Sequence, residues 1–104
     1  MGNMRVEVPH NMPLADAKLR MEALGDYLQN RHGIKVVWNG NSASANGRYL
    51  VVGIEGTMTV SEKMVDFEGK DPGFLWRGKA KDYLAGKLKS YLDTATPVEQ
   101  LPRK

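Results

Sequence analysis

The fold is decided by residues 4–33, which read MRVEVPHNMPLADAKLRMEALGDYLQNRHG. The opening of this stretch alternates apolar and charged residues, and this period of two predicts a half-buried strand that ends at Pro9. From Pro13 to about Arg31 the apolar residues recur instead at spacings of three and four, which predicts an amphipathic helix. The apolar positions of this helix are Leu14, Ala17, Met21, Leu24 and Leu28. Gly33 follows the last turn and is a candidate left-handed cap.

The chain beyond this helix is predicted to be mostly strand. Residues 34–38 are an apolar run that indicates a second strand. Residues 39–47 are turn-forming and small, which predicts a mobile loop between two antiparallel strands. Residues 48–54 are apolar on both faces, so we expect a third strand that lies centrally in the sheet.

Two further strands and a second helix are predicted before the C-terminal segment. Gly56 is expected to allow a turn, and residues 57–60 and 64–68 then alternate apolar and polar side chains. Residues 61–63 between them are expected to form a hairpin turn. Apolar residues at helical spacing predict a second amphipathic helix over about residues 74–93.

The element order leads to a fold class. Short connections between the later strands require antiparallel pairing, and two amphipathic helices require a sheet face to cover. We therefore expect an α+β two-layer sandwich of order β-α-β-β-β-α, in which a further strand before the second helix stays open, with a mainly antiparallel four- or five-stranded sheet and both helices on one face. Residues 4–93 are predicted to form this single domain. Residues 94–104 contain two prolines and few apolar side chains, which predicts a flexible C-terminal tail.

The charge balance is slightly positive. The chain has 104 residues, with 15 Lys and Arg against 12 Asp and Glu and a formal net charge of +3. Two of the basic residues, Arg103 and Lys104, lie in the predicted tail, so the rest of the chain gives only weak support for a polyanionic partner.

The sequence also predicts where the protein resides. It contains no cysteine, which excludes disulfides, thiolate nucleophiles and zinc–thiolate sites. No stretch approaches the run of about 18 apolar residues that a transmembrane helix needs, and the first residues lack the apolar core of a secretory signal. We therefore expect no transmembrane segment and a cytoplasmic location.

Few residues offer catalytic chemistry. His10 and His32 lie at opposite ends of the first predicted helix, so roughly 30 Å of helix keeps them from sharing a metal or a proton relay. No serine lies in a Gly-x-Ser-x-Gly elbow, and the glycines form no phosphate-binding loop. Asp66 and Glu68 share one strand face, where a solvated face is a simpler interpretation than an acid–base pair. We predict no catalytic residues, no cofactor and no metal site, and a small-ligand pocket between sheet and helices stays open.

Four residues of the second helix are candidates for contact with a partner. Phe74, Leu75 and Trp76 form the densest apolar cluster, and a helix cannot bury three consecutive side chains against one sheet. Phe74 or Leu75 is therefore expected to be exposed, which suits docking, although core or hydrophobic-staple packing is the favoured interpretation of the cluster. Lys87 lies within the apolar arc of its helix. We expect its stem to follow the sheet edge with the ammonium in water; the alternative is a lysine that meets a ligand anion or a partner carboxylate.

Three segments carry a resemblance to a known family. Residues 4–18, MRVEVPHNMPLADAK, are similar to the start of the putative polyhydroxyalkanoic acid system proteins, which are small bacterial proteins grouped with polyhydroxyalkanoate granule genes. Residues 56–60, GTMTV, and residues 72–76, PGFLW, are further points of similarity. The resemblance covers roughly residues 4–93. It implies association with storage-polymer granules and carries over no catalytic residue.

Two classes of function follow. The first is a non-enzymatic protein that associates with the granule surface or with granule proteins through an apolar patch near residues 74–76. This patch is expected at a sheet edge or a dimer surface, and a homodimer stays open. The alternative is an RNA- or ribosome-binding module, because the element order resembles ribosome-hibernation factors and double-stranded-RNA domains. Lys and Arg are dispersed around the second helix, so nucleic acid is less favoured, and an enzyme is the least favoured class.

Overall fold

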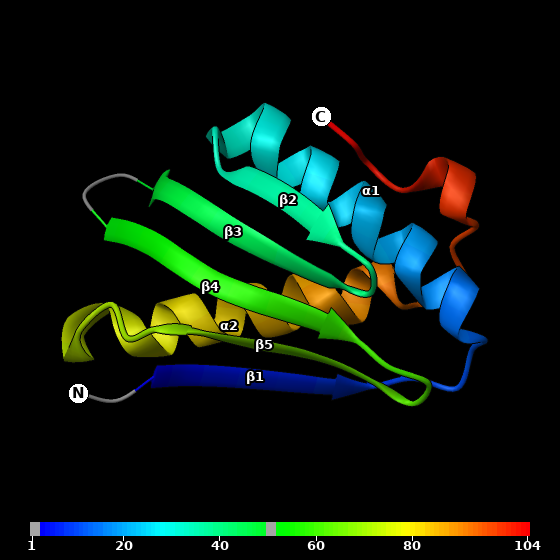
Figure 1. Cartoon of the computed structure of the whole chain (residues 1–104), viewed down its shortest axis with the longest axis horizontal. Coiled ribbons are helices and arrows are strands. Elements are labelled where there is room, and N and C mark those ends of the chain that lie inside the picture. Colours follow the sequence, from blue (N-terminus) through cyan, green and yellow to red (C-terminus); the bar gives the residue numbers. More distant parts are fainter. Residues whose placement is uncertain (1–2, 50–51) are drawn as a thin grey trace.

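The computed structural model of the chain describes residues 3–49 and 52–104, which form a two-layer α+β sandwich (Figure 1). Within these residues, an antiparallel sheet of five strands packs against two helices, which confirms the predicted fold class. The elements are β1 (Asn3–Pro9), α1 (Leu14–His32), β2 (Lys35–Asn39), β3 (Ser42–Tyr49), β4 (Val52–Val60), β5 (Met64–Lys70), α2 (Phe74–Tyr91) and a short 3₁₀ helix, η1 (Val98–Gln100).

The alternation in the first strand decides which sheet face the helices cover. Met4, Val6 and Val8 are buried in β1, and the residues between them are exposed. The strand order is β1-β5-β4-β3-β2, so β1 and β2 are the two edges. The helix α1 connects these edges and contacts β2 and β4, whereas α2 lies against β1 (Figure 1). Because successive side chains point to opposite faces, the other face of β1 carries its charged residues.

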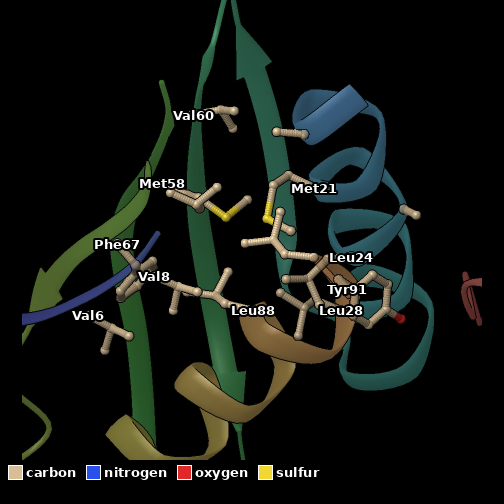
Figure 2. Packing of buried hydrophobic residues seen from close by; sticks show 14 of the residues in the cluster. Val6, Val8, Met21, Leu24, Leu28, Met58, Val60, Phe67, Leu88 and Tyr91 are labelled. Carbon is tan, nitrogen blue, oxygen red and sulfur yellow. The ribbon is translucent and has the colours of Figure 1, made fainter. Parts of the chain in front are cut away.

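The core lies between the sheet, α1 and the last turns of α2 (Figure 2). Ala17, Met21 and Leu24 are at most 1% exposed, as the helical period predicts. The residues that pack with them include Val8, Met58, Val60, Val65, Phe67, Leu88 and Tyr91. Gly33 ends α1 at φ 70°, and its N–H donates to the Gln29 carbonyl, which confirms the predicted cap.

The predicted loop over residues 39–47 is wrong, because most of it is strand β3. The connection from β2 is a two-residue turn at Gly40 and Asn41, where Gly40 takes φ 64°. Ala43 and Ala45 are 2% and 8% exposed and belong to the covered face, while the residues between them are polar. Cross-strand hydrogen bonds and burial therefore override the weak strand propensity of Ala, Ser and Asn.

The predicted third strand over residues 48–54 is also wrong as a single element. Arg48 belongs to β3, which ends at Tyr49, and it pairs with Gly53 of β4. The segment therefore spans the ends of two neighbouring antiparallel strands. Leu50 and Val51, which the sequence places in the middle of that strand, lie outside the described residues. A continuous apolar run does not distinguish one buried strand from the adjoining ends of two.

Gly56 is not a turn, because it lies inside β4 opposite Gly69 of β5. A Cβ atom at Gly56 would lie 2.5 Å from Cζ of Phe67, and one at Gly69 would lie 2.9 Å from Cε1 of the same ring. Glycine is needed at both positions because the Phe67 ring occupies the space that a side chain would take. The hairpin turn at residues 61–63 is confirmed: the N–H and the hydroxyl of Ser61 both donate to the Met64 carbonyl.

Arg20 is buried, whereas the helical pattern places it outside the apolar face. Its guanidinium donates to the Tyr91 carbonyl at 3.1 Å and to the Asp93 carbonyl at 3.0 Å. These carbonyls lie at the end of α2, where the helix itself supplies no donors. Arg20 thus joins α1 to the C-terminal end of α2.

Residues 94–104, predicted from composition to be a flexible tail, lie against α1 in the structure (Figure 1). Leu101 is buried, and the Tyr91 hydroxyl donates to the Pro102 carbonyl at 2.6 Å. Arg103 pairs with Asp26 of α1. The mobility of this segment stays a prediction for a solution measurement.

Candidate functional site

The loop before α2 fixes the direction in which this helix starts. Gly73 takes φ 101°, a conformation that favours glycine, and its N–H donates to Oδ1 of Asp71 at 2.8 Å. Nε of Arg77 donates to Oδ2 of Asp71 at 2.8 Å. These hydrogen bonds, first from Arg77 and then from Gly73, lower the pKa of Asp71 below its usual value. The Asp71 carboxylate therefore holds the first turn of α2 in place. The side chains of Asp71 and Arg77 both remain near the surface.

This first turn presents two large apolar side chains to solvent. Phe74 is 80% exposed and Leu75 is 75% exposed. Core or staple packing, the favoured interpretation of the cluster, is therefore wrong for both Phe74 and Leu75. The sequence predicts that one of the two is exposed, and in the structure both are. Trp76 is half-buried and points to the inner side of the helix, where it lines a groove. We call Phe74 and Leu75 the α2 patch.

Basic residues outnumber acidic ones on the helix that carries the α2 patch. The helix contains Arg77, Lys79, Lys81, Lys87 and Lys89 against one acidic residue, Asp82. Nζ of Lys79 lies 5.8 Å from the centroid of the Trp76 ring, within cation–π range. An apolar tip with adjoining positive charge is the pattern of helices that dock on amphiphilic surfaces.

Lys87 lies over aromatic rings rather than along the sheet edge. Its Nζ is 4.4 Å from the ring centroid of Tyr27 and 5.7 Å from that of Tyr83. The faces of these rings attract the ammonium, and the lysine is half-buried as a result. The structure thus places Lys87 between α1 and α2, away from the α2 patch, and its predicted role toward a ligand or partner anion is untested.

His32 completes this aromatic cluster. Its ring makes edge contacts with Tyr27 and Tyr83 at centroid distances of 5.9 and 6.0 Å, and its Nε2 is 3.0 Å from the Tyr83 hydroxyl. Burial lowers the pKa of His32, and the positive charges of Arg31 and Lys87 lower it further. Both effects favour the neutral form of the imidazole.

His10 has a structural role in the turn before α1. It is buried, with Nε2 2.8 Å from the Ser61 carbonyl, and its Nδ1 accepts a hydrogen bond from the Met12 N–H at 3.2 Å. The two bonds require the tautomer that carries its proton on Nε2. Both ring nitrogens are thus engaged in joining the β4–β5 turn to the entrance of α1.

An apolar groove of about 330 Å³ opens between the sheet and the first half of α2. The sheet side of the groove includes Met4, Ala45, Ile54 and Phe67. The α2 side consists of Trp76, Lys79, Ala80, Tyr83 and Leu84, which share one face of the helix. His32 and Leu28 of α1 also line the groove. The groove exists because α2 buries only its last turns, at Leu88 and Tyr91.

The sequence indicates the α2 patch but not the groove. The patch follows from three consecutive large apolar residues, which no helix can bury together. The groove brings together residues from β1, β3, β4, β5 and both helices, and these are distant in the sequence. Its only sequence signal is the weak amphipathic pattern of α2, which the two interior glycines Gly78 and Gly86 interrupt.

The described parts of the chain also bear on a metal site, a membrane-spanning helix and an acid–base pair. Over residues 3–49 and 52–104, no three His, Asp or Glu side chains come together in a way that could hold a metal ion. In the same ranges, no helix is long and apolar enough to cross a membrane. Asp66 faces the outer side of the sheet and pairs with Arg5 at 2.9 Å, as expected for a solvated strand face.

Comparison with known proteins gives one match. A family model described as putative polyhydroxyalkanoic acid system protein matches residues 4–95, which include the α2 patch and the groove. No curated protein and no solved structure matches the chain.

Proposed function

The chain belongs to the putative polyhydroxyalkanoic acid system family, and from this premise we propose that it is a non-enzymatic bacterial protein that associates with polyhydroxyalkanoate storage granules in the cytoplasm. The observation that carries the proposal is the α2 patch. Phe74 and Leu75 are at least three-quarters exposed, and monomeric proteins seldom leave large apolar side chains together in solvent unless they contact a partner.

The chemistry of the granule surface suits this patch. A polyester surface is largely apolar, and the carboxylate ends of its polymer chains would attract basic residues. Phe74 and Leu75 would enter the apolar layer, while Arg77 and Lys81 on the same helix would remain at its charged boundary. Full burial of the two apolar side chains contributes about 1.5–3 kcal/mol each.

The test is co-sedimentation with purified granules. We expect the native chain to sediment with the granules, and the double variant Phe74→Ser, Leu75→Ser to lose affinity by roughly a hundredfold or more. The matched control is Val37→Ser on β2, since Val37 is an exposed apolar residue on a different surface. This control is expected to sediment as the native chain does.

Two results would overturn the proposal. The native chain could remain in the soluble fraction, or the double variant could sediment as well as the native chain. The competing RNA-binding function predicts instead a salt-sensitive affinity for RNA that the double variant retains. Measuring binding to RNA at low and high salt therefore separates the two functions.

A further inference from the structure

The groove between α2 and the sheet is apolar on both sides. It stays open because several of the residues that line it are small. Ala45 of β3 and Ala80 of α2 both line it, and Gly53 contributes no side chain. A volume of about 330 Å³ lies at the lower end of the range for small-molecule sites. Larger residues at these positions would close the groove and bury more apolar surface. The groove therefore has the size and the lining of a ligand site.

The length of the groove limits the ligand. The α2 residues that line it run from Trp76 to Leu84, which corresponds to roughly 12 Å of helix. An all-trans aliphatic chain advances about 1.25 Å per C–C bond, from a bond length of about 1.5 Å and a bond angle of about 111°, so this length accommodates about nine or ten bonds. The groove thus fits a medium-length aliphatic chain.

The charged residues that line the groove indicate what kind of head group a ligand would carry. Its lining includes two lysines, Lys70 and Lys79, against one carboxylate, Glu55. The Lys79 ammonium contacts the Trp76 ring and forms no ion pair within the residues that the structure describes. The whole of α2 carries five basic residues against one acidic residue. An anionic head group is therefore complementary to this side of the groove.

We propose that the groove binds a medium-chain aliphatic carboxylate, with its chain between the sheet and α2 and its carboxylate beside Lys79. This proposal goes beyond granule association and rests on different residues. His32 and the Tyr83 hydroxyl lie in the lining, with Nε2 of His32 3.0 Å from that hydroxyl. This hydrogen-bonded pair is a polar part of the lining that a hydroxyl group on the ligand chain would meet.

Titration with sodium decanoate below its micelle concentration tests the proposal. The sequence has two tryptophans, so a Trp38→Phe background makes Trp76 the sole tryptophan and the source of the fluorescence signal excited at long wavelength, and calorimetry gives the stoichiometry. We expect saturable binding of one decanoate per chain, weakened about fourfold for each methylene removed. Decyltrimethylammonium, which has the same chain and a cationic head, is expected to bind more weakly. A parallel titration with 3-hydroxydecanoate distinguishes the source of the ligand: tighter binding indicates a hydroxyalkanoate, and equal binding indicates a simple fatty acid.

Two pairs of variants locate the site. Ala80→Phe fills the groove and is expected to abolish binding, whereas the α2 patch variant Phe74→Ser, Leu75→Ser is expected to bind decanoate as the native chain does. Lys79→Glu is expected to weaken binding at least about threefold. Lys81→Glu is its control, since Lys81 lies on the same helix outside the groove lining. Both lysine substitutions are at the surface, so they remain informative if Ala80→Phe disturbs folding.

The proposal is overturned by the absence of saturable decanoate binding, by equal affinity for the cationic amphiphile, or by unchanged binding in folded Ala80→Phe and Lys79→Glu. Its failure is distinguishable from failure of granule association, because each function has its own variant. Ala80→Phe is expected to sediment with granules as the native chain does.

Discussion

Phe67 and the two glycines beside it, Gly56 and Gly69, determine the shape of the groove on its sheet side. The Phe67 ring lies over Gly56 and Gly69, which face each other on neighbouring strands. Phe67 also lines the groove. A side chain at either glycine would displace the ring, because a Cβ atom there comes within 2.9 Å of it. Gly56, where the sequence suggests a turn, and Gly69 thus keep the sheet side of the groove in place.

The pH dependence of folding is predicted to include a contribution from His32. Because the pKa of His32 is lowered in the folded protein, the unfolded chain binds more protons as pH falls through the ordinary histidine pKa near 6.5. Stability from this group is therefore present above about pH 6.5 and is lost as pH falls below that value. We expect His32→Gln to lose less stability than the native chain between about pH 7 and pH 5.

Urea unfolding of both proteins at each pH checks this difference. His10 is present in both chains, so its contribution cancels in the comparison. Equal loss of stability in the two proteins would contradict the account of His32.

At the scale of elements, α2 is a helix of two unequal halves. Its last turns are anchored: Leu88 is fully buried, and Arg20 binds the carbonyls of Tyr91 and Asp93. Its first turns cover the groove and are held mainly by the Asp71 carboxylate. Gly78 lies in this exposed half, with no atom near the position of a Cβ. Glycine inside a helix lowers its stability, but Gly86 lies in the second half of α2, so the two halves differ in packing rather than in helix propensity.

Replacement of this glycine is predicted to stabilise the protein. Gly78→Ala meets open space and is expected to raise the free energy of unfolding by about 0.5–1 kcal/mol. Gly73→Ala is the matched contrast, because Gly73 takes φ 101°. That substitution is expected to destabilise by about 1 kcal/mol or more. Chemical denaturation measures both, and a destabilising Gly78→Ala would show that the helix requires glycine there for packing.

Strand β3 shows what propensity cannot predict. Its residues Ser42 to Gly47 are typical of a loop in isolation, yet the strand pairs along both sides, with β2 and with β4. Small residues at Ala43 and Ala45 alternate with polar ones, but this alternation is too weak in hydrophobicity to identify a strand. The first strand and α1 were predictable because their apolar residues are large and strictly periodic.

At the scale of the whole molecule, the candidate sites differ in how far the sequence reveals them. The exposure of one residue of the α2 patch was predictable, since crowding of Phe74, Leu75 and Trp76 on one helix is a local property, but the exposure of both was not, because the sequence favoured core or staple packing. The groove was not predictable, because it depends on how far α2 lies from the sheet and on which residues of six elements meet there. Figure 1 shows the reason: β1 and α2 are far apart in the sequence but lie side by side in the structure.

The charges are also arranged at this scale. The outer face of the sheet carries both signs, and Arg5 lies between Asp66 and Glu7. Basic residues outnumber acidic ones on α2, the helix that carries the α2 patch. The modest net charge of +3 therefore hides an excess of positive charge on this helix.

Hydrogen–deuterium exchange, measured with and without polyhydroxyalkanoate particles, tests most directly whether α2 is the docking element. We expect bound particles to slow exchange in the first turns of α2, around residues 74–80, and to leave β2 and β3 unchanged. Slowed exchange confined to the sheet, or unchanged exchange in α2 of particle-bound protein, would contradict the account.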